Sequence, residues 1–102
     1  MANLLRIAAV SELPPQGEMR EFLLGSVPVC VVNLDGTFTA LGGVCPHKGG
    51  PLAEGIIERG NIVCPWHGWE FRIADGQSAN HPGASVKVFK LVIHGADVFL
   101  ES

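Results

Sequence analysis

Two short segments of this chain each place one cysteine close to one histidine, and they constrain the fold more than any other feature. The first segment is Cys45-Pro46-His47 and the second is Cys64-Pro65-Trp66-His67, with sixteen residues between them. Thiolate sulfur and imidazole nitrogen are both common metal ligands, so the two segments are able to close on one metal centre. The chain must then fold so that two loops, joined by a hairpin-sized spacer, meet at one point.

The rest of the sequence consists of short apolar runs separated by turn residues, a pattern typical of an all-β protein. The pair Asp35-Gly36 favours a type I′ hairpin, because both of its central residues need a positive φ. Residues 42–51 and 78–84 are expected to be loops, and no helical periodicity longer than about two turns is present. We expect strands at residues 4–10, 18–24, 27–34, 37–41, 56–58, 62–64, 69–73, 86–94 (the longest) and 97–100.

Length and charge narrow the class of protein. With 102 residues, the chain is expected to form a single domain over residues 1–102. The net charge of −3 and the scattered basic residues offer no basic face for a phosphate backbone, so no nucleic-acid partner is expected. No apolar stretch is long enough to span a bilayer, and residues 4–10 lack the pattern of a signal peptide. We therefore expect a cytoplasmic protein without a membrane partner.

The three cysteines indicate metal binding rather than disulfide bonds. Their number is odd, and two of them sit in the Cys/His pairs of a chain without an export signal. Cys30, in contrast, lies inside the apolar run 27–34 and is interpreted as a buried core residue rather than as a third ligand.

The four candidate ligands leave two kinds of metal centre open. Two Cys and two His are a common structural zinc set, so a zinc-stabilised binding module is one hypothesis. Familiar zinc fingers, however, pair Cys with Cys and His with His, whereas each segment here contributes one of each. A [2Fe–2S] cluster would need this mixing if each loop reached both irons, with the cysteines on one iron and the histidines on the other. The spacing therefore favours an iron–sulfur cluster over zinc.

At these residues the sequence resembles the Rieske family, whose signature is Cys-x-His, a spacer and Cys-x-x-His. The flanking segments 48–52 (Lys-Gly-Gly-Pro-Leu) and 69–71 (Trp-Glu-Phe) are also similar to the family, and the likeness covers essentially the whole chain. The resemblance implies one [2Fe–2S] cluster, with Cys45 and Cys64 on the inner iron and His47 and His67 on the outer iron.

The resemblance also implies a fold. Rieske (ISP-like) proteins have an antiparallel β-sandwich base, which maps here to roughly residues 1–41 and 72–102. An inserted cluster-binding subdomain maps to roughly residues 42–71.

Three positions make the resemblance closer to low-potential members of the family, such as ferredoxins of bacterial oxygenase systems and the small subunit of assimilatory nitrite reductase. In Rieske proteins of cytochrome bc complexes, an extra cysteine in each loop forms a disulfide; the matching residues here are Gly50 and Trp66. Those proteins also place a serine, which donates a hydrogen bond to a cluster sulfide, where Trp69 stands here. Loss of that donor is expected to lower the reduction potential to the low end of the Rieske range, roughly −150 mV.

The function that the resemblance implies is one-electron transfer, and the chain is expected to be a component of an oxidoreductase system rather than an enzyme. Electrons would pass from a flavin-dependent reductase to a terminal oxygenase. The alternative is a small electron-transfer subunit of an assimilatory nitrite reductase-like complex. An oxygenase would need a further iron held by two His and a carboxylate, and only His81 and His94 remain for it.

Further expectations concern side chains around the two segments. Trp66 is expected to be exposed and Trp69 to be buried. His81 is either a solvated imidazole or part of a loop that places Pro82 against the cluster, as a comparable proline loop does in the family. His94 is expected at the surface.

Overall fold

The computed structural model describes residues 4–46, 49–66 and 68–101. His47, Lys48 and His67 lie outside this described part. All of the longer elements within it are strands, which confirms the all-β class. The strands are β1 (Leu4–Ala9), β2 (Met19–Leu24), β3 (Val27–Leu34), β4 (Thr37–Gly42), β5 (Ile56–Glu58), β6 (Asn61–Val63), β7 (Glu70–Arg72), β8 (Val88–His94) and β9 (Asp97–Glu101), and the two short 3-10 helices are η1 (Val10–Glu12) and η2 (Leu52–Glu54).

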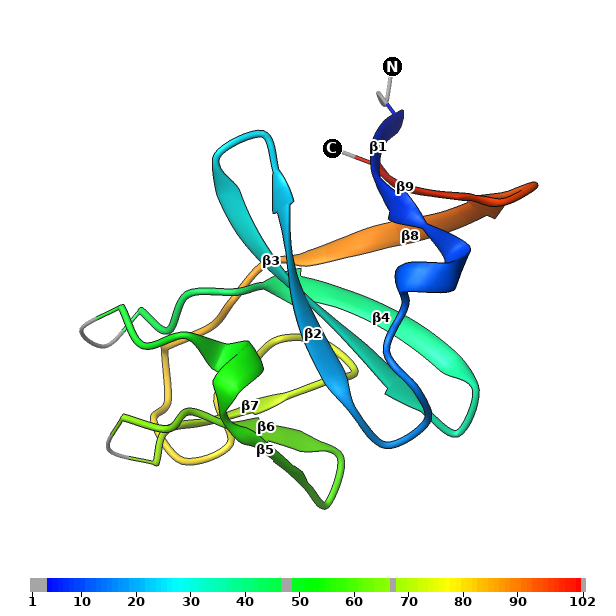
Figure 1. Ribbon diagram of the computed structural model, residues 1–102. Coiled ribbons are helices and arrows are strands. Elements are labelled where there is room, and N and C mark those ends of the chain that lie inside the picture. Colours follow the sequence, from blue (N-terminus) through cyan, green and yellow to red (C-terminus); the bar gives the residue numbers. More distant parts are fainter. Residues whose placement is uncertain (1–3, 47–48, 67, 102) are drawn as a thin grey trace.

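The strands form two antiparallel sheets (Figure 1). The larger has six strands in the order β1-β9-β8-β4-β3-β2, so it combines the beginning and the end of the chain. The middle of the chain forms the smaller sheet, in the order β5-β6-β7. Strands β4 and β8 are joined by only two residue pairs, Ala40 with Phe89 and Leu41 with Val88. The larger sheet therefore consists of two well-paired groups of three strands, β1-β9-β8 and β4-β3-β2, which are joined by few residue pairs.

Two hairpin turns have a positive φ at both central residues, and the sequence predicts this for the first of them. Asp35 and Gly36 have φ values of 53° and 82°, as a type I′ turn requires. Arg59 and Gly60, between β5 and β6, have φ values of 52° and 79°. Positive φ at both central residues matches the right-handed twist of the flanking strands, so both turns fix the register of their hairpins.

The prediction that residues 86–94 form the longest strand is wrong. Strand β8 begins at Val88, and the eight-residue β3 is longer. The reason is that residues just before β8 pair elsewhere: the Val86 N–H donates to the Gly76 carbonyl at 2.8 Å, and Ser85 forms a bridge with Gln77. The apolar run continues through this change of partner, so hydrophobicity alone could not locate the boundary.

Strand β3 is buried on both faces and connects the two clusters of the hydrophobic core. Val29 and Val31 pack on one side, in a cluster with Ala40, Phe89 and Leu100. Because side chains alternate along a strand, Cys30 and Val32 point to the other side. Their cluster includes residues of both sheets and of the loops: Leu41, Cys45, Leu52, Ile62, Cys64, Phe71, Ile73 and Val86. The candidate cysteine ligands thus belong to the core that lies between the two sheets.

No helix in the described ranges is long and apolar enough to cross a membrane.

Candidate metal centre

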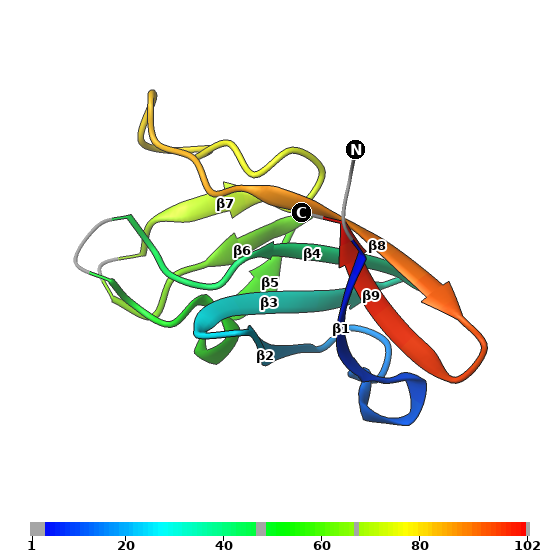
Figure 2. The same ribbon diagram turned by 90° about the horizontal axis from the view of Figure 1, so that it is seen from above.

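The loops that carry the two candidate cysteines lie side by side at one end of the molecule (Figures 1 and 2). We call residues 43–52 the first ligand loop and residues 64–69 the second ligand loop. The base of the first is closed by the Leu52 N–H, which donates to the Gly43 carbonyl at 3.0 Å, and by a β-bridge between Val44 and Pro51. The second loop joins β6 to β7 directly. Both loops are therefore anchored where they leave regular structure.

The same backbone hydrogen bond closes both loops around their cysteine. The Cys45 N–H donates to the Gly50 carbonyl at 2.8 Å, and the Cys64 N–H donates to the Trp69 carbonyl at 2.7 Å. In each case the acceptor lies five residues after the cysteine. The two cysteines, which belong to similar segments in the sequence, thus also make the same closing hydrogen bond.

Each loop has a glycine directly before this acceptor, in a conformation that other residues rarely adopt. The φ of Gly49 is 73° and that of Gly68 is 70°. A side chain at such a φ clashes with the backbone, so both positions favour glycine. The Gly49 N–H also donates to the Cys45 carbonyl at 3.0 Å, which tightens the first loop.

Cys45 and Cys64 are each 1 % exposed. The Trp66 N–H donates to the Cys64 sulfur at 3.4 Å. A hydrogen bond to sulfur stabilises negative charge on it, as a metal-bound thiolate requires. Burial of the two cysteines together with a backbone donor is the environment expected for the inner ligands of a cluster.

The two ligand loops touch through Gly50 and Trp66. A methyl group added at Gly50 would lie 2.7 Å from the Cys64 sulfur and 3.2 Å from the Trp66 Cγ and Cδ2 atoms. The ring of Trp66 thus lies against the backbone of Gly50, while 47 % of this residue remains exposed, which confirms the expected exposure. The two positions that match disulfide cysteines in other Rieske proteins are in contact here without a covalent bond.

The donor set fits a [2Fe–2S] cluster as far as the described residues go. Two buried cysteines sit on two loops that touch, and all three cysteines of the chain, each in the described part, are outside disulfides. Among described residues no group of three metal-ligating side chains is present. Because His47 and His67 lie outside the described ranges, the four-residue ligand set remains a prediction.

Trp69 is partly buried and packs against the core cluster that contains Cys64, so the expected burial is partial. Its ring stacks on the imidazole of His81, with ring centroids 3.7 Å apart and an interplanar angle of 12°. The loop 78–84 therefore contacts the second ligand loop through His81, whereas Pro82 is exposed. His94 is exposed, as expected.

Sequence reasoning missed the polar residues that fasten loop 78–84 to the second ligand loop. The Asn80 side-chain amide donates to the Gly68 carbonyl at 3.1 Å, and its oxygen accepts from the Glu70 N–H at 3.0 Å. The Ser78 hydroxyl donates to the Glu70 carbonyl at 2.9 Å and accepts from the His81 N–H at 3.0 Å. Ser and Asn do signal a turn in sequence. Their partners eight to twelve residues away cannot be read from it.

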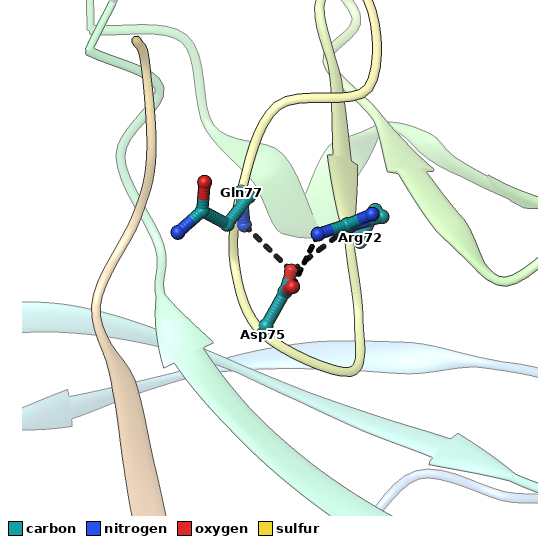
Figure 3. A network of polar contacts seen from close by, with 3 residues as sticks. All are labelled: Arg72, Asp75 and Gln77. Carbon is teal, nitrogen blue, oxygen red and sulfur yellow. Dashed lines mark hydrogen bonds and ion pairs between the residues drawn. The ribbon is translucent and has the colours of Figure 1, made fainter. Parts of the chain in front are cut away.

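A second polar network holds the turn that leads into this loop (Figure 3). The Asp75 carboxylate accepts from Arg72 Nε at 3.1 Å, from Arg72 Nη2, and from the Gln77 N–H at 3.0 Å. The hydrogen bond from Arg72, followed by that from Gln77, lowers the pKa of Asp75 below its ordinary value. The network fixes the direction in which the chain leaves β7.

Cys30 is fully buried in β3, as the sequence predicts. Burial, with a smaller contribution from the negative charge of Glu21, raises the pKa of its thiol to about 12. Since the thiolate is the form that binds metal or reacts, this cysteine has the properties of a core residue.

Comparison with known proteins gives a consistent picture. Residues 3–90 match the Rieske [2Fe-2S] domain, and proteins of that family bind a single [2Fe–2S] cluster. The chain is 41 % identical over 87 residues to apoptosis-inducing factor 3 of Homo sapiens. The matched region is 84 % of this chain but only 14 % of that protein. It is 35 % identical over 95 residues to the ferredoxin component of the alkene monooxygenase system of Xanthobacter autotrophicus. The matched region is 92 % of this chain and 77 % of that protein.

Solved structures agree with these matches. A ferredoxin of Sphingomonas yanoikuyae B1 superposes with a TM-score of 0.85 at 26 % identity, over 98 % of this chain and 99 % of that one. A putative NADH-dependent nitrite reductase small subunit of Mycobacterium tuberculosis gives a TM-score of 0.84 at 24 % identity, over 100 % of this chain and 96 % of that one. The second similarity is one of fold alone. Together with the two antiparallel sheets, these likenesses confirm the expected Rieske fold.

Proposed function

Because this chain belongs to the Rieske [2Fe-2S] domain family, we propose that it carries single electrons through one cluster held by Cys45, His47, Cys64 and His67. The observation that carries the proposal is the pair of ligand loops. Each loop is closed by a hydrogen bond from its cysteine N–H to the carbonyl five residues later, and the two loops touch. Two thiolates and two imidazoles, one of each from either loop, are the Rieske ligand set.

The protein's own residues would tune the centre in three ways. When bound, the cluster supplies reversible one-electron chemistry. Burial of the two cysteines keeps water away from their sulfur atoms, and the Trp66 N–H offsets negative charge on the Cys64 sulfur. Trp69 has no hydroxyl to donate to a sulfide, so we propose a potential at the low end of the Rieske range, roughly −150 mV.

We further propose that residues 42–71 act as the cluster-binding subdomain on a base formed by residues 1–41 and 72–102. Support comes from the separate three-stranded sheet and from the second ligand loop, which joins β6 to β7 within it. A cytoplasmic location follows from the same chemistry, because thiols kept for metal binding persist in a reducing compartment.

For partners, we propose a flavin-dependent reductase as the electron donor and a terminal oxygenase as the acceptor. The support is the similarity to the alkene monooxygenase ferredoxin, of which the chain spans 77 %. A second candidate is a small subunit of a nitrite reductase-like complex, favoured by the fold shared with the mycobacterial protein. Stopped-flow reduction by a flavin reductase, followed by reoxidation on mixing with an oxygenase, tests the first. Stable co-elution with a larger reductase subunit would favour the second.

The deciding experiment on the cofactor is absorption and low-temperature EPR spectroscopy of the purified protein, as isolated and after reduction with dithionite. We expect a red-brown protein whose reduced form has the rhombic signal of a histidine-ligated [2Fe–2S] cluster. Cys64→Ala should abolish the signal, while Cys30→Ala should keep it. A colourless protein with stoichiometric zinc would overturn the proposal and favour the hypothesis of a zinc-stabilised binding module.

A further inference from the structure

We propose that Asn80 is a positioning residue for the second ligand loop. Its side-chain amide joins the backbone on both sides of Trp69, at Gly68 and at Glu70. This inference rests on the proposed function, since it assumes that the second ligand loop holds the cluster through Cys64 and His67.

The geometry needs a side chain that donates and accepts at once. Asn80 Nδ2 donates to the Gly68 carbonyl at 3.1 Å, and Asn80 Oδ1 accepts from the Glu70 N–H at 3.0 Å. A primary amide offers both functions at a fixed separation, whereas a carboxylate only accepts. The two bonds therefore hold residues 68–70, which we call the tripeptide, in one conformation.

Neighbouring contacts keep Asn80 itself in place. The Ala79 N–H donates to the Glu70 carbonyl at 2.9 Å, and the Ser78 hydroxyl donates to the same carbonyl at 2.9 Å. On the other side of Asn80, the His81 ring stacks on Trp69. Loop 78–84 thus contacts the tripeptide through hydrogen bonds to its backbone and through the stacking of His81 on Trp69.

The tripeptide matters because both of its first two residues shape the second ligand loop. Gly68 follows His67 in sequence and has a φ of 70°. Because glycine adopts positive and negative φ about equally readily, contacts from outside are what hold Gly68 in this conformation. The Trp69 carbonyl accepts the hydrogen bond from Cys64 that closes this loop. If the tripeptide is loosened, the closing bond is loosened as well, and the ligands on the loop lose their fixed orientation.

The test is the rate at which the cluster is released to a chelator, measured by the loss of visible absorption, together with the EPR g values of the reduced protein. Removal of a residue that orients metal ligands typically weakens metal binding by about 10- to 100-fold. We expect Asn80→Ala to release the cluster about 10-fold faster and to shift the g values. Asn80→Asp should also release the cluster faster, because a carboxylate can still accept from the Glu70 N–H but cannot donate to the Gly68 carbonyl.

A matched control separates positioning from general loss of stability. The Asn33 side chain also links two backbone groups, donating to the Pro14 carbonyl at 3.0 Å and accepting from the Gly36 N–H at 3.2 Å. It lies near the hairpin turn of β3 and β4, at the opposite end of these strands from the first ligand loop. Asn33→Ala should lower Tm but leave the g values and, well below Tm, the release rate unchanged.

The outcomes distinguish this inference from the proposed function. Equal release rates and g values in Asn80→Ala and in the unmodified protein would overturn the positioning role while the cluster assignment stands. The same holds if Asn33→Ala reproduces both effects. Absence of a rhombic signal from the unmodified protein would instead overturn the proposed function.

Discussion

The indole ring of Trp66 lies against the backbone of Gly50, and this contact joins the two ligand loops across the candidate site. A Cβ atom at Gly50 would come within 2.7 Å of the Cys64 sulfur, closer than real Cβ contacts. The contact therefore depends on the absence of a side chain at this position.

We predict that Gly50→Ala impairs cluster binding. The added methyl group must push either the Cys64 sulfur or the Trp66 ring away, so iron content of the purified protein should fall to less than about half, in line with the effect of displacing a metal ligand. Gly42→Ala is the matched control, because a methyl group there meets its nearest neighbour at 3.7 Å, an ordinary contact. Normal iron content in Gly50→Ala would show that the site tolerates the shift.

A second prediction concerns Cys30 and pH. Cys30→Ala should retain two irons per chain and lose about 1 kcal/mol of stability through the smaller side chain. In the unmodified protein, the thiol pKa of about 12 lies above its ordinary value of 9.0. The unfolded chain therefore loses this proton first as pH rises, and stability falls above about pH 9, by at most about 1.4 kcal/mol per pH unit.

Urea unfolding at pH 8 and pH 10 checks this prediction. Because Cys30→Ala lacks the thiol, its stability should fall less between the two pH values than that of the unmodified protein. An equal fall in both proteins would mean that another group causes the alkaline loss.

A third prediction compares two glycines with similar backbone conformations. Gly76 and Gly83 have φ values of 75° and 91°. A methyl group at Gly76 would lie 2.1 Å from the Val86 carbonyl oxygen, whereas one at Gly83 meets nothing within 4 Å. Gly83→Ala should cost about 1 kcal/mol from backbone strain alone. Gly76→Ala should lower the free energy of unfolding by on the order of 4 kcal/mol, because it also breaks the hydrogen bond from the Val86 N–H to the Gly76 carbonyl. Chemical denaturation measures both, and equal losses would contradict the steric argument.

A fourth prediction tests the turn in Figure 3. The lowered pKa of Asp75 means that its carboxylate stabilises the fold above its ordinary pKa of 3.8, and that this contribution is lost as pH falls through the lower folded-state pKa. Asp75→Asn should therefore melt at a slightly lower temperature at pH 7, and the difference should shrink toward pH 3. Both groups are exposed, so the effect is small. Asp35→Asn, on another exposed turn, controls for loss of one negative charge.

The sequence predicts features that depend on local chemistry. The turn at Asp35-Gly36 forms as expected because positive φ is a property of these residues themselves. Burial of Cys30 follows from its place in a continuous apolar run, and the loops that carry Cys45 and Cys64 do lie side by side.

Features that depend on distant partners were not predictable in this way. Strand β8 begins two residues later than expected because Val86 bonds to Gly76. Trp69 packs partly against the core and stacks on His81 from a separate loop, and nothing in the residues near Trp69 specifies that partner. The same is true of Asn80, whose role depends on a contact twelve residues back along the chain.

The burial of β3 on both faces has a consequence for folding errors. Its odd-numbered valines and its even-numbered residues fill different cores. A slip of one residue in its pairing with β2 or β4 would send each side chain to the opposite face. Val29 and Val31 would then face the cysteines, and the side chain of Asn33 would turn into the space that Val32 occupies. A misaligned hairpin would thus disrupt both clusters together, including the one that contains Cys45 and Cys64.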